Sequence, residues 1–261
     1  MKTLHSTWCD RSRLFHFCVT LLVLCLFTSC SRSEKYVQGY VEGEFVYVSS
    51  PLSGPLQTLQ VQRGAKVKEK DPLFLLDSTV EKAALDQAQA ALTFSEQDLA
   101  RQEKLSLIPG SAALRDFQLA RFVRDADSQR LAQAQWNFSQ KQQVAPKAGL
   151  VFDTLYREGE WVEAGHPVVV LLPPQNIEVR AFVPERVIGT INPGDKAEVF
   201  VDGVKEPFVG KIVYVFHKAE YTPPVIYSEE SRSKLVYMIE ITFDPEIAVK
   251  LHPGQPVDVR L

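Results

Sequence analysis

One stretch limits the fold of this chain more than any other: residues 79–142 are made of good helix formers and are interrupted once, by Pro109-Gly110. Alanine, leucine, glutamine, glutamate, arginine and lysine dominate on both sides of this break, and all have high helix propensity. The pattern predicts two helices, over residues 79–107 and 113–141, that turn back at residues 108–111. Each arm would be about 43 Å long at the α-helical rise per residue. We therefore expect an antiparallel helical hairpin.

Apolar side chains recur along both arms with a seven-residue period, beginning with Leu85, Leu92 and Leu99. The second arm keeps one heptad frame in which two mid-arm positions are charged; its members are Phe117, Ala120, Arg124, Asp127, Leu131, Ala134 and Phe138. A narrow stripe on each arm predicts a left-handed coiled coil with one seam. The outer faces are predicted to be polar, through Glu81, Lys82, Gln87, Glu96, Gln97, Arg101 and Glu103. An ordinary hairpin inside a larger helical core is the alternative.

The N-terminal residues 1–30 have the features of an export signal. Basic residues precede an apolar run over residues 14–27, which is too short to span a bilayer comfortably. All four cysteines lie in this segment, and the last of them, Cys30, ends the sequence Leu26-Phe27-Thr28-Ser29-Cys30. This ending resembles a bacterial lipobox, although Phe27 stands where that motif has an aliphatic residue. The resemblance implies acylation of Cys30 and membrane anchoring. A plain cleaved signal or a short uncleaved anchor is the alternative.

An internal repeat flanks the helical stretch. Residues 50–76 and 145–171 align without a gap at a constant offset, so that each turn residue of the first segment has a counterpart in the second. The matched pairs are Pro51 and Pro146, Gly54 and Gly149, Gly64 and Gly159, Val67 and Val162, and Pro72 and Pro167. The shared pattern of turns and short strands predicts two half-domains. Because each half is too small to bury a core alone, we expect them to pair into one compact β structure.

The two repeats resemble the halves of a biotinyl/lipoyl domain, but no lysine stands at the joint, where the first half ends in Asp77-Ser78. A lipoyl half, a helical hairpin and a second lipoyl half, in that order, resemble the periplasmic adaptors (membrane fusion proteins) of haemolysin-secretion, HlyD-like type. The resemblance covers the chain from Phe45 onward.

The resemblance implies an α+β fold: a split biotinyl/lipoyl-like β domain, an inserted antiparallel coiled-coil hairpin, and a small C-terminal β-barrel. The expected segments are an anchor (1–30), a tether and first strand (31–44), the split domain (45–78 and 143–172), the hairpin (79–142) and the barrel (175–261). The alternating strand at residues 177–183 and the later short strands separated by Gly-Asp and Pro-Gly turns support the barrel.

No catalytic constellation is found in the sequence. The five histidines are scattered, no phosphate-binding glycine loop or nucleophile elbow occurs, and no carboxylate pair has a defensible spacing. The net charge of −3, without a basic block, also argues against a nucleic-acid partner. We therefore expect a protein that is not an enzyme and that holds no cofactor or metal.

The resemblance implies a periplasmic adaptor that is held at a membrane, most simply the inner one, and forms homo-oligomers. It would link an inner-membrane exporter, ABC-type or proton-driven, to an outer-membrane duct of TolC type. The implied duct contacts are Arg101, Leu105 and Ser111 at the hairpin tip, with Ser111 one residue earlier than in the family pattern. For the tip, the alternative is that Leu105 packs into the seam and Arg101 is a solvated surface residue. A structural envelope lipoprotein and a biotin or lipoyl carrier subunit are alternative functions.

Overall fold

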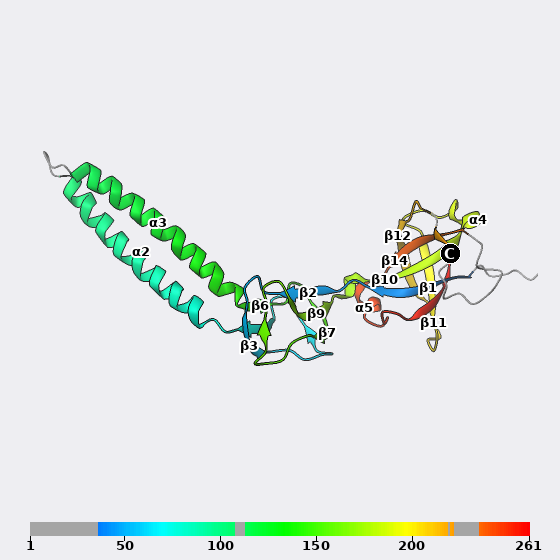
Figure 1. Cartoon of the computed structure of the whole chain (residues 1–261). Coiled ribbons are helices and arrows are strands. Elements are labelled where there is room, and N and C mark those ends of the chain that lie inside the picture. Colours follow the sequence, from blue (N-terminus) through cyan, green and yellow to red (C-terminus); the bar gives the residue numbers. More distant parts are fainter. Residues whose placement is uncertain (1–35, 108–112, 219, 222–234) are drawn as a thin grey trace, which may run out of the picture.

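The computed structural model describes residues 36–107, 113–218, 220–221 and 235–261, which form three parts in a row. A helical hairpin lies at one end, a small β domain lies in the middle, and a β-barrel lies at the other end (Figure 1). The chain order differs from the spatial order, because strands of the two β parts come from both sides of the hairpin in sequence. This α+β architecture agrees with the predicted fold class.

The hairpin consists of α2 (Thr79–Ser106) and α3 (Ala113–Gln140), whose ends differ from the predicted ends by at most one residue. Each helix has 28 residues, so each is about 42 Å long. The predicted turn at residues 108–111 lies outside the described residues. The two helices run antiparallel and side by side over their whole length (Figure 1).

The predicted heptad positions form the interface between the two helices. Ala120, Leu131 and Ala134 of α3 are buried there, while Leu92 of α2 is half-buried. The two heptad frames also bury polar residues: Ser95 on α2, and Asp127, which pairs with Arg130 (2.7 Å), on α3. The described seam is thus apolar near the base and polar near its middle, as the charged mid-arm positions of the sequence indicated.

The middle domain consists of two four-stranded sheets, ordered β2-β9-β7-β4 and β6-β5-β3-β8. Its strands are β2 (Val46–Ser49), β3 (Gly54–Leu59), β4 (Lys66–Val67), β5 (Pro72–Leu76), β6 (Gln142–Val144), β7 (Gly149–Thr154), β8 (Trp161–Val162) and β9 (Pro167–Leu172). The sequence repeat maps β3 onto β7, β4 onto β8 and β5 onto β9. Exchanging the equivalent strands converts one sheet order into the other, so the domain has an internal two-fold relation.

The two repeats share one hydrophobic core. Leu56 and its counterpart Val151 are both fully buried in it, and Val67 and Val162 belong to the same cluster. The equivalent turn glycines, Gly64 and Gly159, have φ values of 85° and 90°, which a residue with a Cβ rarely adopts. The expectation that both halves pair into one compact β structure is therefore met.

The barrel is a closed ring of six strands, because β10 pairs with β1 on one side and with β14 on the other. Around the ring come β1 (Tyr36–Gly43), β15 (Pro256–Arg260), β11 (Lys196–Val201), β12 (Phe208–Val215), β14 (Leu235–Thr242) and β10 (Ile177–Pro184). The two-residue strand β13 (Glu220–Tyr221) adds to β14 outside the ring. Three short helical turns complete it: η1 (Pro174–Asn176), α4 (Glu185–Ile188) and α5 (Pro245–Ala248).

The first strand of the described chain differs from its prediction. We expected residues 31–44 to be a tether and first strand outside a barrel of residues 175–261. Instead, β1 is a full member of the barrel and lies between β10 and β15. Its inward side chains Val37 and Val41 are buried in the barrel core, which explains why the alternation of this segment matches a half-buried strand.

The barrel and the middle domain meet at a short polar and aromatic joint. The backbone amide of Glu44 donates to the carbonyl of Asn176, and the side-chain amide of Asn176 donates back to the Glu44 carbonyl, both at 2.9 Å. Next to this pair, the rings of Phe45 and Phe152 lie 4.4 Å apart. These contacts join the two β parts where the chain crosses between them twice.

Candidate functional site

The described part of the predicted tip lies on one exposed side of α2. Arg101 is exposed and forms an ion pair with Asp98, one turn earlier in the helix. Leu105 is 43% exposed. Because Arg101 and Leu105 are four residues apart, they occupy neighbouring positions on the helix surface. Ser111 lies outside the described residues.

A row of mostly exposed apolar residues lies on the same side of the hairpin nearer its base, and we call it the apolar flank. On α2 its members follow at spacings of three, four or seven residues, and on α3 at three or four, so each set lies along one side of its helix. Members of the flank are Val80, Ala84, Ala91 and Phe94 on α2 and Leu119, Val123 and Ala126 on α3. Phe94 is 69% exposed and Leu119 is 61% exposed. Exposed apolar residues that follow one another along one side of a helix are typical of an interaction surface, whereas single ones are not.

Residues of the α2 part of the flank line a groove whose other wall is formed by α3. It has a volume of about 550 Å³ and runs between the two helices near their base. Its walls come from α2 through Val80, Glu81, Ala84, Gln87, Ala88 and Ala91 and from α3 through Arg130, Gln133, Ala134 and Asn137. Since Val123 and Ala126 lie seven and four residues before Arg130, they continue the same side of α3 toward the tip.

The opposite side of the hairpin is mainly polar. Its polar helix positions are Lys82, Asp86, Gln89, Glu96 and Glu103 on α2 and Gln118, Arg121, Asp125, Ser128 and Gln135 on α3, almost all of them exposed. Three large apolar residues of α3, Leu114, Phe122 and Trp136, are also exposed on this side. The prediction of polar outer faces therefore holds for α2 on this side, and is wrong at these three residues and on the apolar flank. The hairpin has a second apolar stripe besides its seam, and the described chain leaves that stripe open.

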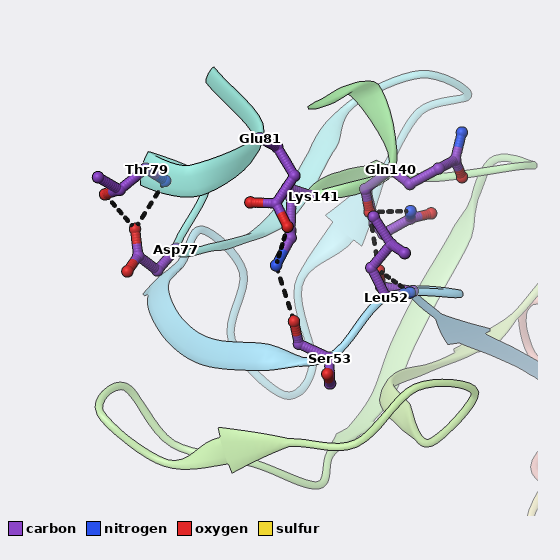
Figure 2. Close-up of polar contacts among 9 residues, drawn as sticks. Leu52, Ser53, Asp77, Thr79, Glu81, Gln140 and Lys141 are labelled. Carbon is purple, nitrogen blue, oxygen red and sulfur yellow. Dashed lines mark hydrogen bonds and ion pairs between the residues drawn. The ribbon is translucent and has the colours of Figure 1, made fainter. Parts of the chain in front are cut away.

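A buried lysine fixes the base of the hairpin to the middle domain. Lys141 follows the last residue of α3, and its side chain is 5% exposed. Its Nζ donates to the backbone carbonyl of Ser53 at 2.7 Å and lies 3.1 Å from Oε1 of Glu81 in the first turn of α2 (Figure 2). The single ammonium group therefore connects both helices to the first lipoyl-like half. This role of Lys141 was not predicted.

Two further contacts hold the same joint (Figure 2). The fully buried Ser50 hydroxyl donates to the carbonyl of Gln140, the last residue of α3. At the start of α2, Oδ1 of Asp77 accepts hydrogen bonds from the hydroxyl and the amide of Thr79. These two hydrogen bonds hold the pKa of Asp77 below its usual value. Both helices thus leave the middle domain from fixed positions, so the hairpin direction is set at its base.

Among the described residues, no candidate metal site accompanies this arrangement. Within the described ranges, no group of three or more histidine, cysteine or carboxylate side chains is close enough to hold a metal ion. The helices that the structure describes also lack an apolar window of the length needed to cross a bilayer. The described hairpin therefore presents a long surface for non-covalent contacts with other proteins or other copies of the chain.

Comparison with solved structures identifies the fold. The chain superposes on a chimera of MacA that contains the Pseudomonas aeruginosa MexA α-hairpin domain with a TM-score of 0.69 and 20% identity, covering 86% of this chain and 79% of the chimera. It also superposes on the membrane fusion protein Spr0693 from Streptococcus pneumoniae with a TM-score of 0.65 and 19% identity, covering 86% and 97% of the two chains. The fold is therefore that of the membrane fusion, or periplasmic adaptor, proteins.

Sequence comparison identifies the family, although no family model matches the chain. The chain spans 54% to 57% of the length of several curated relatives that it matches at 31% to 32% identity. The UPF0194 membrane protein YE2891 of Yersinia enterocolitica is 34% identical, and the match covers 85% of this chain and 88% of that protein. On the strength of this near full-length match, the chain belongs to the UPF0194 family of membrane proteins.

Proposed function

We propose that this chain is the periplasmic adaptor subunit of an export system. In this role it links an inner-membrane exporter, either ABC-type or proton-driven, to an outer-membrane duct of TolC type. The hairpin carries the proposal: a rod about 42 Å long is fixed at its base by Lys141 and has an apolar flank that remains largely exposed among the described residues. The shared fold with membrane fusion proteins supports the same role.

The apolar flank supports self-association. A single hairpin cannot enclose a passage, so several copies are needed, and each copy brings an identical flank. Burying a phenylalanine such as Phe94 stabilises an interface by about 1.5–3 kcal/mol. We therefore propose a homo-oligomer in which the flank of one hairpin packs against the neighbouring hairpin, leaving the polar side facing water.

A pair of single charge substitutions tests this arrangement. Phe94→Asp places a charge on the flank, while Thr93→Asp places the same charge on the next residue, toward the polar side. We expect Phe94→Asp to abolish the multimers trapped by amine cross-linking, and Thr93→Asp to leave them at the wild-type level. Equal multimer yields for both variants would contradict the proposed interface.

The tip residues Arg101, Leu105 and Ser111 are proposed to contact the duct. A photo-cross-linking amino acid at Leu105 should give an adduct with an outer-membrane duct protein, whereas the same group at Glu103, on the polar side, should give little. Deleting residues 105–112 should abolish substrate export. Unchanged export in the deletion variant would rule out a role for the tip.

Co-purification distinguishes the adaptor from a structural envelope lipoprotein. An adaptor should bring down an inner-membrane exporter from detergent-solubilised envelopes, whereas a lipoprotein that only spaces two membranes should bring down none. The anchor is tested separately, because Cys30 is proposed to be acylated. Cys30→Ser should then move the protein from the membrane fraction to the soluble fraction, and retention in the membrane would exclude acylation as the anchor.

A further inference from the structure

The outer surface of the barrel has a groove that the adaptor role does not use. Its volume is about 800 Å³, and it crosses β10, β1, β15 and β11 at the edge that faces the turn after β11. The lining residues that define its chemistry are Tyr40, Phe182, Phe200, Asp202, Pro256 and Asp258. Three aromatic rings and two carboxylates thus share one hollow surface.

Strand register sets the positions of these groups. Asp258 of β15 is paired with Gln38 of β1 on one side and with Phe200 of β11 on the other. Tyr40 faces Pro256 across the same pair of strands, and its ring lies 6.1 Å from that of Phe182. Because neighbouring strands lie about 4.8 Å apart, the exposed Asp258 lies directly beside Phe200 on one strand and diagonally from Tyr40 on the other.

The charge of the groove lining is negative. Among the residues that line the groove, the ionisable side chains are Asp202, Asp258 and the Tyr40 phenol, and none of them is basic. The nearest arginine on this face, Arg260, lies over the Phe200 ring at 5.4 Å and is paired with Glu198. That contact shows that the Phe200 ring accepts a cation within its own fold.

The surface next to Tyr40 adds further negative charge. Arg180 is paired with Tyr40 in the strand register and forms ion pairs with three carboxylates: Glu178 at 3.1 Å, Glu240 at 3.5 Å and Glu42 at 3.9 Å. Three carboxylates around one guanidinium leave this cluster net negative. The groove is therefore aromatic, concave and bordered by excess negative charge.

We propose that this groove binds an amphipathic organic cation, meaning a small molecule with aromatic or alkyl surface and one delocalised positive charge. The ring faces stabilise such a ligand through cation–π attraction and apolar burial, and the Asp258 carboxylate in the groove attracts its positive charge. An anion of the same size and shape gains the burial but is repelled by both aspartates. The site lies on the barrel and is independent of the hairpin, so it can be tested apart from the adaptor role.

Two isosteric probes isolate the contribution of charge. Tetraphenylphosphonium and tetraphenylborate have nearly the same shape and opposite charge, and binding of each to the full chain is measured by equilibrium dialysis. We expect the cation to bind with a dissociation constant below about 1 mM and the anion to bind at least about tenfold more weakly. Asp258→Asn should weaken cation binding about fivefold or more, whereas Asp86→Asn, which removes an exposed carboxylate on the hairpin, should not change it.

The aromatic contribution is tested in the same way. Phe200→Leu should weaken cation binding severalfold, while Phe122→Leu, an equally conservative change at an exposed position on the hairpin, should have no effect. Circular dichroism melts check that each variant is folded as the wild type is. If no cation binding is detected at a probe concentration of 1 mM, the binding free energy is weaker than about −4 kcal/mol and the proposal is overturned. So would equal binding of both probes, or binding that is unaffected by both groove substitutions.

Discussion

Lys141 offers the sharpest test of how the hairpin is held. Lys141→Met keeps most of the apolar stem but removes the ammonium group, which donates to Ser53 at 2.7 Å and pairs with Glu81 at 3.1 Å. A hydrogen bond to a charged group contributes about 1.5–3 kcal/mol, and breaking a fully buried ion pair costs about 3–5 kcal/mol. Since the Glu81 side chain is 21% exposed, it can regain water when its partner is lost. We therefore expect a loss of about 2–3 kcal/mol in the free energy of unfolding.

Guanidinium unfolding followed by helical circular dichroism measures this loss, because both long helices depend on the joint. Lys82→Met is the matched control: Lys82 is the next residue after Glu81, it is exposed, and its loss should cost less than about 0.5 kcal/mol. A double-mutant cycle with Glu81→Gln should give a coupling energy of about 1–2 kcal/mol. If Lys141→Met costs no more than the control, the ammonium group does not stabilise the joint and the reasoning fails.

Lys70 has a left-handed backbone (φ 69°) at the repeat position where the second half has Gly165 (φ 80°). Lys70→Gly should therefore raise the free energy of unfolding by up to about 1 kcal/mol in denaturant titrations, and a loss would contradict the strain argument. Asp127→Leu should leave the unfolding free energy unchanged or raise it, because it removes a buried carboxylate from the seam; a loss above about 1 kcal/mol would mean that its ion pair outweighs desolvation. Burial, and then the negative charge of Glu240, raises the pKa of Glu178 above its usual value. Because this folded-state pKa exceeds the unfolded one, ionisation of Glu178 destabilises the barrel as pH rises above about 4.3, so Glu178→Gln should raise the melting temperature at pH 7 but not at pH 3. An equal shift at both pH values would refute that linkage.

The hairpin and the internal repeat were predictable because both depend on local sequence. Helix ends follow from residue propensity and from the single Pro-Gly break, so the predicted and observed limits of α2 and α3 nearly coincide. The repeat fixed the strand equivalences, since Gly64 and Gly159 need the same backbone conformation. A pattern that recurs within a few residues requires no knowledge of distant partners.

Features that depend on distant pairing were missed. Nothing local to β1 indicates that its partners are β10 and β15, because any half-buried strand has the same alternation. The groove of the barrel likewise exists only once the register brings Tyr40, Phe200 and Asp258 to one face. Lys141 directly follows a polar helix, and it is buried where it contacts Ser53, far away in sequence.

The apolar flank was missed for a different reason. Phe94 and Leu119 are isolated large residues in a background of alanine and polar side chains, so the stronger seven-residue stripe of the seam obscured them. Plotting each arm on a helical wheel, after removing the seam positions, would have placed Val80 and Phe94 together. The site residues Arg101 and Leu105 could be named from the sequence only through the family resemblance.

The position of β1 has a consequence for the order in which the chain folds. The ring contains both the first and the last described strands, with Tyr36 opposite Arg260, so it cannot close until the chain has been synthesised as far as Arg260. The hairpin, by contrast, needs only contacts between sequence neighbours, which form early and fast. When its two helices pair, they bring the separated lipoyl-like halves close to each other. This reduces the loss of conformational entropy when the halves join. During translation the rod would then serve as a template for the middle domain, and the barrel would be the last part to assemble.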